Sequence, residues 1–200
     1  METLQNIIIA SGYLGIFVTI FAESGFLLGI FLPGDSLLFT LGLFASKGSF
    51  SILILWILSV SAAILGDSFG YFSGRKFGPA IFSKENSLFF RKSYLDKTQA
   101  FYDKYGKKTI ILARFVPIVR TLAPIFAGVA NMNYRTFVSY NIIGGILWPS
   151  IMLFSGFFLG NIFPGIKNYL SEVILIIIFL SFLPVIFELV KTYKSRRIKS

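Results

Sequence analysis

The sequence predicts an all-α integral membrane protein, and three observations support that prediction. Hydrophobic residues make up 55% of the 200 residues and charged residues only 14%, whereas soluble domains carry about 25% charged residues. Several apolar stretches are long enough to cross a hydrocarbon core about 30 Å thick as helices. The net charge of +10 is concentrated in two basic segments, as it is in the loops that flank membrane spans.

The first element is an apolar stretch over residues 7–45 that does not fit a simple span. It is interrupted by Glu23, Pro33, Gly34 and Asp35. An isolated straight helix in lipid would not carry these residues, because a proline removes a backbone donor and each charge needs a partner. We therefore expect a broken, re-entrant hairpin that is buried in protein.

The second element is an ordinary transmembrane helix over residues 51–71, which leads into a glycine-rich face. Gly66, Gly70 and Gly74 recur every four residues, and the missing side chains let neighbouring helices approach closely. Asp67 begins this face and is expected at membrane depth. We interpret the face as a packing surface within the protein, and a homodimer interface is the alternative.

A basic connector over residues 79–108 follows. Residues 75–108 hold nine basic and three acidic residues, and residues 191–199 hold five basic and no acidic ones. Because short loops beside membrane spans are enriched in Lys and Arg on the cytoplasmic side, both segments are predicted to be cytoplasmic. Nucleic-acid binding is the alternative reading of such charge, but no recognition motif accompanies it.

The second half of the chain repeats the plan of the first. Residues 110–132 are apolar but interrupted by Arg114, Pro117, Arg120 and Pro124, which predicts a second broken hairpin. Residues 137–159 predict a second ordinary span, and residues 173–190 a last one. The prolines and glycines of both halves are expected to shape the hairpins and pack the helices.

An inverted repeat follows from this plan together with the charge distribution. Gly70 and Gly74 match Gly156 and Gly160 at an offset of 86 residues. If the basic segments are cytoplasmic, the two halves run in opposite directions, which is the plan of many secondary transporters. We expect one transmembrane domain, made of a first repeat (1–78), the connector (79–108), a second repeat (109–165), and a C-terminal helix with a basic tail (166–200).

Four charged residues within the broken apolar segments are the candidate functional residues: Glu23, Asp35, Arg114 and Arg120. A charge near the bilayer centre costs about 2.5–3.5 kcal/mol on insertion scales, so such residues meet partners, water or a ligand. One interpretation is a pair of buried Arg–carboxylate bridges. The other is a functional site, which we favour because a buried bridge often adds no more stability than apolar side chains would.

The residue types suggest a role for each side chain. A chain break at Pro117 could let Arg114 and Arg120 converge on one anion, and guanidinium groups suit phosphate oxygens. A carboxylate in a low-dielectric environment favours its protonated form, so Glu23 or Asp35 could exchange a proton. The expected partners are membrane lipids with an anionic phosphate headgroup, and protons.

Composition also excludes several kinds of chemistry. The chain has no His and no Cys, which excludes a Ser-His-Asp triad, a thiol nucleophile and a His/Cys metal site. Nothing resembles a nucleophile with its base, so we expect no enzyme, no metal and no cofactor.

Several motifs in order resemble the DedA family, within the wider SNARE-associated, VTT-domain superfamily. They cover residues 12–160 and include Leu32-Pro33-Gly34-Asp35, Gly66-Asp67-(x2)-Gly70-Tyr71-(x2)-Gly74-Arg75, Arg114-Phe115-Val116-Pro117-(x2)-Arg120-Thr121-(x2)-Pro124, Ala127-Gly128-(x3)-Met132 and Asn141-(x2)-Gly144-(x3)-Trp148. The resemblance implies a bacterial inner-membrane protein with two opposed re-entrant hairpins.

The resemblance further implies a lipid translocase that depends on proton motive force. On the family pattern, Glu23 and Asp35 would be the proton-linked acids, and Arg114 and Arg120 the essential arginines. Undecaprenyl phosphate is the first substrate to consider, and phosphatidylethanolamine or other phospholipids are the alternative. A small-ion or drug/proton antiporter and a non-transporting assembly factor also remain open.

Overall fold

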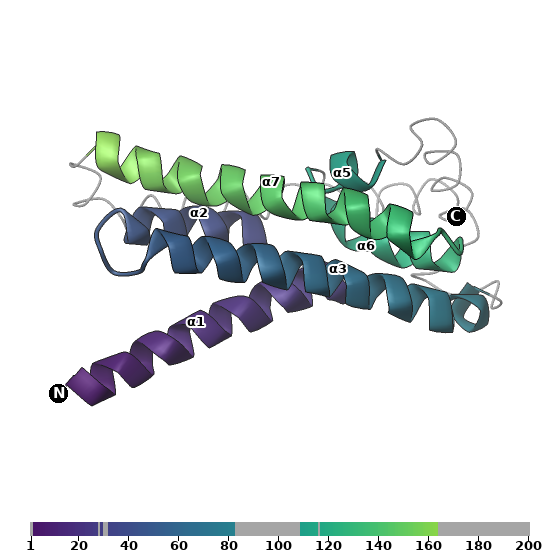
Figure 1. Ribbon diagram of the computed structural model, residues 1–200, viewed down its shortest axis with the longest axis horizontal. Helices are drawn as coiled ribbons and strands as arrows, with labels where there is room; N and C mark the ends of the chain where they lie inside the picture. Colours follow the sequence, from purple (N-terminus) through teal and green to yellow (C-terminus); the bar gives the residue numbers. More distant parts are fainter. Residues whose placement is uncertain (1, 28, 30–31, 83–108, 116, 164–200) are drawn as a thin grey trace, which may run out of the picture. The chain divides into compact units, whose positions relative to one another are not determined.

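The computed structural model describes residues 2–27, 29, 32–82, 109–115 and 117–163. In this part of the chain the regular structure consists of helices: α1 (Glu2–Gly25), α2 (Gly34–Ala45), α3 (Ile52–Phe82), α5 (Thr109–Ala113), α6 (Pro117–Val129) and α7 (Tyr134–Ile162) (Figure 1). The all-helical prediction is therefore confirmed for the described residues.

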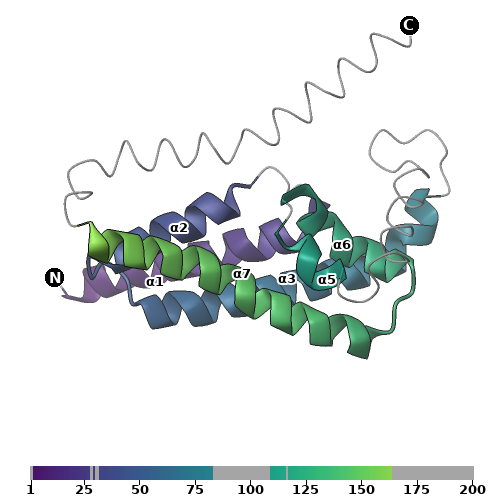
Figure 2. The same ribbon diagram turned by 90° about the horizontal axis from the view of Figure 1, so that it is seen from above.

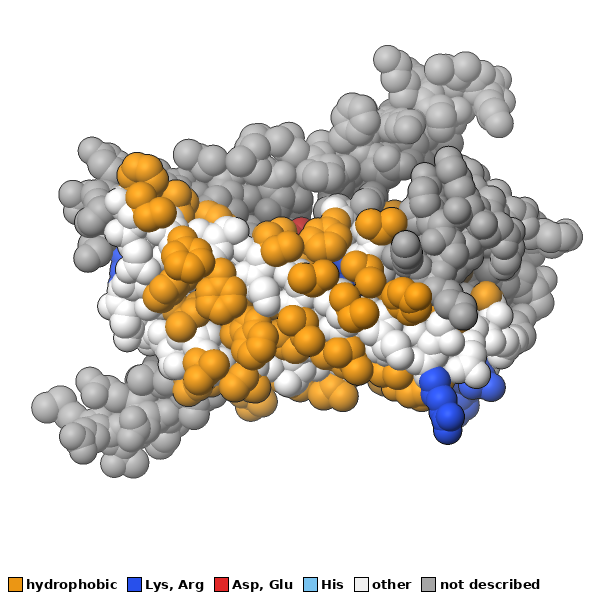
Figure 3. All heavy atoms as spheres, turned by 45° about the horizontal axis from the view of Figure 1, so that its top comes forward, with side chains coloured by type: hydrophobic (Ala, Val, Ile, Leu, Met, Phe, Trp, Pro, Cys, Tyr) orange, Lys and Arg blue, Asp and Glu red, His pale blue; other side chains and the backbone are white. Residues whose placement is uncertain are grey.

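Two of the helices are long and apolar enough to cross a membrane, at Ile52–Phe77 in α3 and at Tyr134–Ile162 in α7. They contain the spans predicted over residues 51–71 and 137–159, apart from Ser51. Many large apolar side chains stay exposed on both helices, including Leu65 and Phe72 on α3 and Ile143 and Phe158 on α7. Figure 3 shows such side chains over much of one face, as expected for a surface that contacts lipid.

The other elements predicted from the sequence lie wholly or partly outside the described residues. The predicted span over residues 173–190 and the basic tail lie outside them. So does most of the basic connector, since only the last residues of α3 reach into it.

Helix interruptions occur at both predicted positions. Between α1 and α2 the chain is non-helical around Pro33, and α6 begins at Pro117 directly after a short break that follows α5. Proline fits the first turn of a helix because its missing N–H has no intrahelical acceptor there. Pro124, by contrast, lies inside α6 without ending it. α5 and α6 pack against each other (Figures 1 and 2), while the re-entrant path through the membrane stays a prediction.

The chain forms two compact units, each of which draws on both halves of the sequence. The first unit comprises Met1–Leu32 and Trp56–Pro149, and the second comprises Pro33–Leu55 and Ser150–Ser200. The first unit therefore holds α1, α5, α6, most of α3 and the N-terminal part of α7. The second holds α2 and the C-terminal part of α7.

In the first unit, glycines set the contacts that α3 makes with its neighbours. A Cβ atom at Gly66 would lie 2.7 Å from the carbonyl oxygen of Phe21 in α1, and one at Gly74 would collide with the backbone of Ile125 in α6. At these glycines α3 therefore approaches α1 and α6 closely.

A sharp turn joins α6 to α7 within the first unit. Asn131 has a φ of 52°, and the amides of Asn131 and Met132 donate to the carbonyl oxygens of Gly128 and Ala127 at 3.0 Å. This bonding pattern and the left-handed residue form a Schellman-type helix end. The hydroxyl of buried Tyr71 donates to the carbonyl of Met132, so α3 holds the turn in place.

In the second unit, α2 packs against the C-terminal part of α7 through glycines. A Cβ atom at Gly42 would collide with the carbonyl oxygen of Leu153, and one at Gly156 with that of Phe39. Gly160 lies equally close to the side chain of Ser46. Gly156 and Gly160 therefore lie where α7 approaches α2 and the residue that follows it.

Candidate functional site

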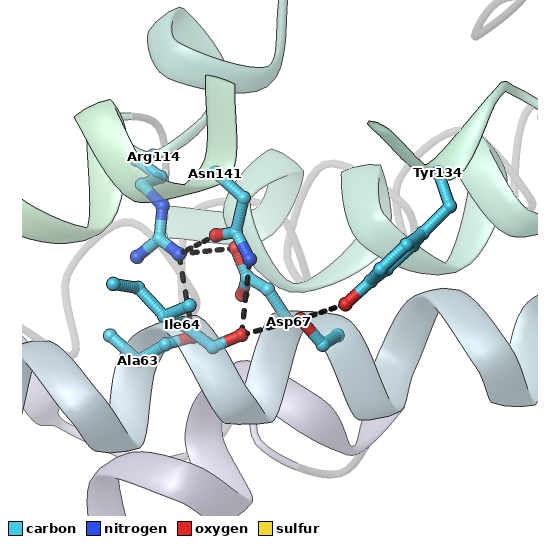
Figure 4. A network of polar contacts seen from close by, with 7 residues as sticks. Ala63, Ile64, Asp67, Arg114, Tyr134 and Asn141 are labelled. Carbon is cyan, nitrogen blue, oxygen red and sulfur yellow. Dashed lines mark hydrogen bonds and ion pairs between the residues drawn. The ribbon is translucent and has the colours of Figure 1, made fainter. Parts of the chain in front are cut away.

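Arg114 lies directly after α5, at the second helix interruption, and its side chain is 1% exposed. Its Nη2 atom forms an ion pair with the carboxylate of Asp67 on α3. The same atom donates to Oδ1 of Asn141 on α7 at 2.5 Å and to the carbonyl of Ala63 at 3.4 Å. Figure 4 shows Asp67 and Asn141 on one side of the guanidinium group. The charge is therefore held between α3 and α7.

Asn141 and two glycines complete the setting of Arg114. The side-chain amide of Asn141 donates to the carbonyl of Ile64 at 3.0 Å, so Asn141 links Arg114 to the backbone of α3. A Cβ atom at Gly144 would lie 2.7 Å from Cδ of Arg114, and one at Gly145 would lie 2.5 Å from the side chain of Ile64. Only residues without a side chain let α7 approach Arg114 and α3 so closely.

Arg120 forms the second buried ion pair, with Glu23 near the C-terminal end of α1. The two side chains are 5% and 0% exposed. The guanidinium carbon of Arg120 also lies 4.5 Å from the ring centroid of buried Trp148 on α7, within the range of a cation–π interaction. α1, α6 and α7 therefore meet at this charge pair.

The chain after α1 folds back over Glu23. The amide of Phe26 donates to the carbonyl of Ala22 at 3.0 Å, and that of Gly29 donates to the carbonyl of Phe26 at 2.9 Å. A Cβ atom at Gly29 would overlap the backbone of Glu23. This tight turn explains why glycine occupies the position and why Glu23 has no exposed surface.

The two ion pairs, Arg114–Asp67 and Arg120–Glu23, form what we call the ion-pair site. Some polar atoms in this site form no hydrogen bond with the described residues. Oδ1 of Asp67 and the Nε and Nη1 atoms of Arg114 are buried there and have no hydrogen-bond partner among the described residues. Buried polar groups are nearly always hydrogen-bonded in folded proteins. Each of these atoms can therefore form a further hydrogen bond.

The two pairs are coupled electrostatically. The charge of Arg120 lies close enough to act on both Asp67 and Arg114. Each guanidinium is balanced by one carboxylate, so the four groups together carry no net charge. Neutral pairing reduces the cost of holding charges in a low-dielectric interior.

Three of the four sequence-predicted charged residues, Glu23, Arg114 and Arg120, belong to the first unit. Both arginines form buried bridges there, Arg120 with Glu23 and Arg114 with Asp67. Asp35 belongs to the second unit, where it is partly buried in the first turn of α2. The convergence of both arginines on one anion stays a prediction.

Sequence reasoning assigned Asp67 only to helix packing and gave no role to Asn141 or Trp148. Asp67 is in fact the ion-pair partner of Arg114. Its position within an apolar span was the available signal, since a charge at membrane depth needs a partner. No comparable signal marked the contacts of Asn141 or Trp148. Among the described residues, no three acidic side chains gather in a way that would hold a metal ion.

Comparison with known proteins finds one matching domain family and several similar membrane proteins. The VTT domain family matches residues 32–158. Protein DedA of Escherichia coli K12 is 47% identical over 181 residues, which cover 90% of this chain and 82% of that protein. An uncharacterised membrane protein of Mycobacterium leprae is 46% identical over 182 residues, covering 90% and 80%. Inner membrane protein YghB of Escherichia coli K12 is 32% identical over 178 residues, covering 89% and 80%. No solved structure matches.

Proposed function

Because the chain belongs to the DedA family of VTT-domain membrane proteins, we propose that it moves a lipid phosphate across the bacterial inner membrane in a proton-coupled cycle. The proposed substrate is undecaprenyl phosphate. The observation that supports this function best is the pair of buried ion pairs, Arg120–Glu23 and Arg114–Asp67, each beside a helix interruption.

Charge balance links phosphate binding to proton uptake at such a site. An anion that enters a neutral ion pair leaves one uncompensated negative charge, which is costly in a low-dielectric interior. If Glu23 takes up a proton at the same time, its carboxyl group becomes neutral and the charge of the site does not change. One monoanionic phosphate and one proton would therefore enter together.

In the proposed cycle Arg120 exchanges one oxygen partner for another. Its guanidinium bonds the carboxylate of Glu23, and a phosphate oxygen could take the place of that carboxylate oxygen once Glu23 is protonated. The face of Trp148 would hold the guanidinium in place during the exchange. When the proton leaves Glu23, the carboxylate would compete for Arg120 again and release the lipid.

The second pair extends the same scheme to a phosphate with two negative charges. Arg114 and Asp67 would take up the second charge and a second proton, and Nη1 and Nε of Arg114 are buried donors without a partner among the described residues. The coupling role predicted for Asp35 remains part of this proposal.

Reconstitution in liposomes tests the proposal. Purified protein would be reconstituted with undecaprenyl phosphate, and the phosphate exposed on each leaflet would be followed under an inward proton gradient. We expect gradient-driven transport by the wild type and by the control variant Glu2→Gln. Glu23→Gln should show none, because its side-chain amide cannot take up and release a proton.

Three outcomes would contradict the proposal. Equal transport with and without the gradient would indicate a scramblase. A Glu23→Gln variant that still responds to the gradient would exclude that carboxylate as the coupling group. Proton exchange for a small cation, with no movement of lipid phosphate, would favour an antiporter.

A further inference from the structure

A polar cavity of about 480 Å³ lies at the turn between α6 and α7 and is separate from the ion-pair site. Its lining residues are Arg75, Asn131, Met132, Asn133, Tyr134 and Arg135. Arg75 and Arg135 are both exposed, and no acidic residue lines the cavity. An open cavity with two cations and no anion is suited to a negatively charged ligand.

The walls of the cavity are connected by contacts between α3 and the α6–α7 turn. Its turn carries the left-handed residue Asn131 and is fixed to α3 by the hydrogen bond from Tyr71 to Met132. The ring of Tyr134 lies 5.3 Å from that of Tyr71 and 4.8 Å from that of Phe72, measured between centroids. These contacts link the helix that carries Arg75 to the turn next to Arg135.

The first amides of α7 do not supply the anion-binding groups. Oδ1 of Asn133 accepts hydrogen bonds from the amides of Arg135 at 3.0 Å and Thr136 at 3.4 Å, which caps the helix. Recognition of an anion falls instead to the guanidinium groups of Arg75 and Arg135, which can bond two phosphate oxygens each.

The position of the cavity favours a lipid as the source of the phosphate. Arg75 lies near the end of the apolar span Ile52–Phe77, where a membrane helix meets the headgroup region. Beside it, Leu65, Phe69 and Phe72 share one face of α3, at spacings of four and three residues, and are 52%, 42% and 50% exposed. A lipid bound here could place its phosphate between the arginines and an acyl chain along this face.

We propose that this cavity binds the phosphate group of an anionic phospholipid of the surrounding leaflet. Under the charge bias of the sequence, that leaflet is the cytoplasmic one. The site would anchor the α6–α7 turn, and with it the helices that carry Arg120 and Trp148, at the membrane surface. It does not depend on which substrate the protein transports.

Lipid-dependent thermal stability of the detergent-purified full-length protein tests the site. The Tm would be followed while phosphatidylglycerol, phosphatidylcholine or inorganic phosphate is added. We expect phosphatidylglycerol to raise the Tm of the wild type more than phosphatidylcholine does. Arg75→Gln with Arg135→Gln should weaken apparent binding of phosphatidylglycerol by about tenfold for each arginine lost, as expected for hydrogen bonds to a charged group.

Two further variants separate binding from folding. Lys47→Gln with Lys76→Gln removes the same amount of charge from residues that do not line the cavity, and it should leave the lipid effect unchanged. Asn133→Asp should keep the helix cap, because Asp caps helices as well as Asn does, yet weaken lipid binding by adding a negative charge to the cavity.

The inference is overturned if the cavity variants respond to phosphatidylglycerol as the wild type does, or if the control pair loses the response equally. An equal effect of inorganic phosphate would identify a site for free phosphate in place of a lipid. Transport assays of the same variants would show separately whether the proposed function holds.

Discussion

Arg114 illustrates how a single charged side chain is accommodated in the interior of this protein. Its Nη2 atom contacts three acceptors, while its Cδ atom packs so closely over Gly144 that even a methyl group would not fit. The ion pair with Asp67 removes the net charge, and Asn141 fixes its orientation. Removal of one partner should therefore affect the fold more than removal of both.

Asp67→Asn should destabilise the protein by about 3–5 kcal/mol, because it leaves the charge of Arg114 buried without a counter-ion. The double variant Asp67→Asn with Arg114→Gln should recover part of that loss, since neither side chain is then charged. Thermal unfolding in one detergent would compare the variants. A double variant that unfolds at a lower temperature than Asp67→Asn would show that the pair does not act as a unit.

Arg120→Lys should fail in transport nearly as completely as Arg120→Ala. An ammonium group can balance the charge of Glu23, but it offers neither the planar fork that suits phosphate nor the flat face that contacts Trp148. The test is lipid transport in liposomes at equal protein content. Normal transport by the lysine variant would exclude a phosphate-binding role for the guanidinium.

The helices of each unit meet through glycines, so helix packing is sensitive to single methyl groups. α2 and α7 touch where Gly42 faces the backbone of Leu153 and where Gly156 faces that of Phe39. A backbone carbonyl cannot rotate away as a flexible side chain can. An added Cβ atom must therefore separate the helices.

Gly42→Ala and Gly156→Ala should each lower the Tm, because the new methyl group would overlap a backbone carbonyl. Gly15→Ala in α1 is the matched control, since a Cβ atom there has no neighbour within 4 Å. Alanine is favoured over glycine inside a helix by about 1 kcal/mol, so the control should keep or raise the Tm. Destabilisation by Gly15→Ala equal to that of Gly156→Ala would contradict the packing argument.

The molecule as a whole is predicted to place its basic segments on the cytoplasmic side. Single cysteines can report this cleanly, because the native chain contains none. Cysteines at Lys47 and Lys167 should react with an impermeant reagent added outside intact cells, and cysteines at Lys97 and Lys194 should react only after the membrane is opened. Labelling of position 97 from outside would overturn the orientation and with it the inverted repeat.

Much of the fold could be predicted from the sequence. The spans in α3 and α7 followed from hydropathy and length alone, since any apolar segment of that length can cross a bilayer as a helix. Both helix interruptions followed from Pro33 and Pro117, because proline lacks the N–H that a continuing helix uses, whereas Pro124 and Pro149 lie inside α6 and α7. Both properties belong to the local chain and require no knowledge of distant neighbours.

The pairing of the charges, by contrast, depends on how distant segments of the chain pack together. Glu23 and Arg120 are 97 residues apart in the chain, and Asp67 and Arg114 are 47 apart. That these residues need partners follows from the amino-acid sequence alone, since an unpaired charge in an apolar environment is costly. Which carboxylate meets which arginine depends on how α1, α3, α6 and α7 pack, and that packing is set by close glycine contacts between segments that local periodicity cannot relate.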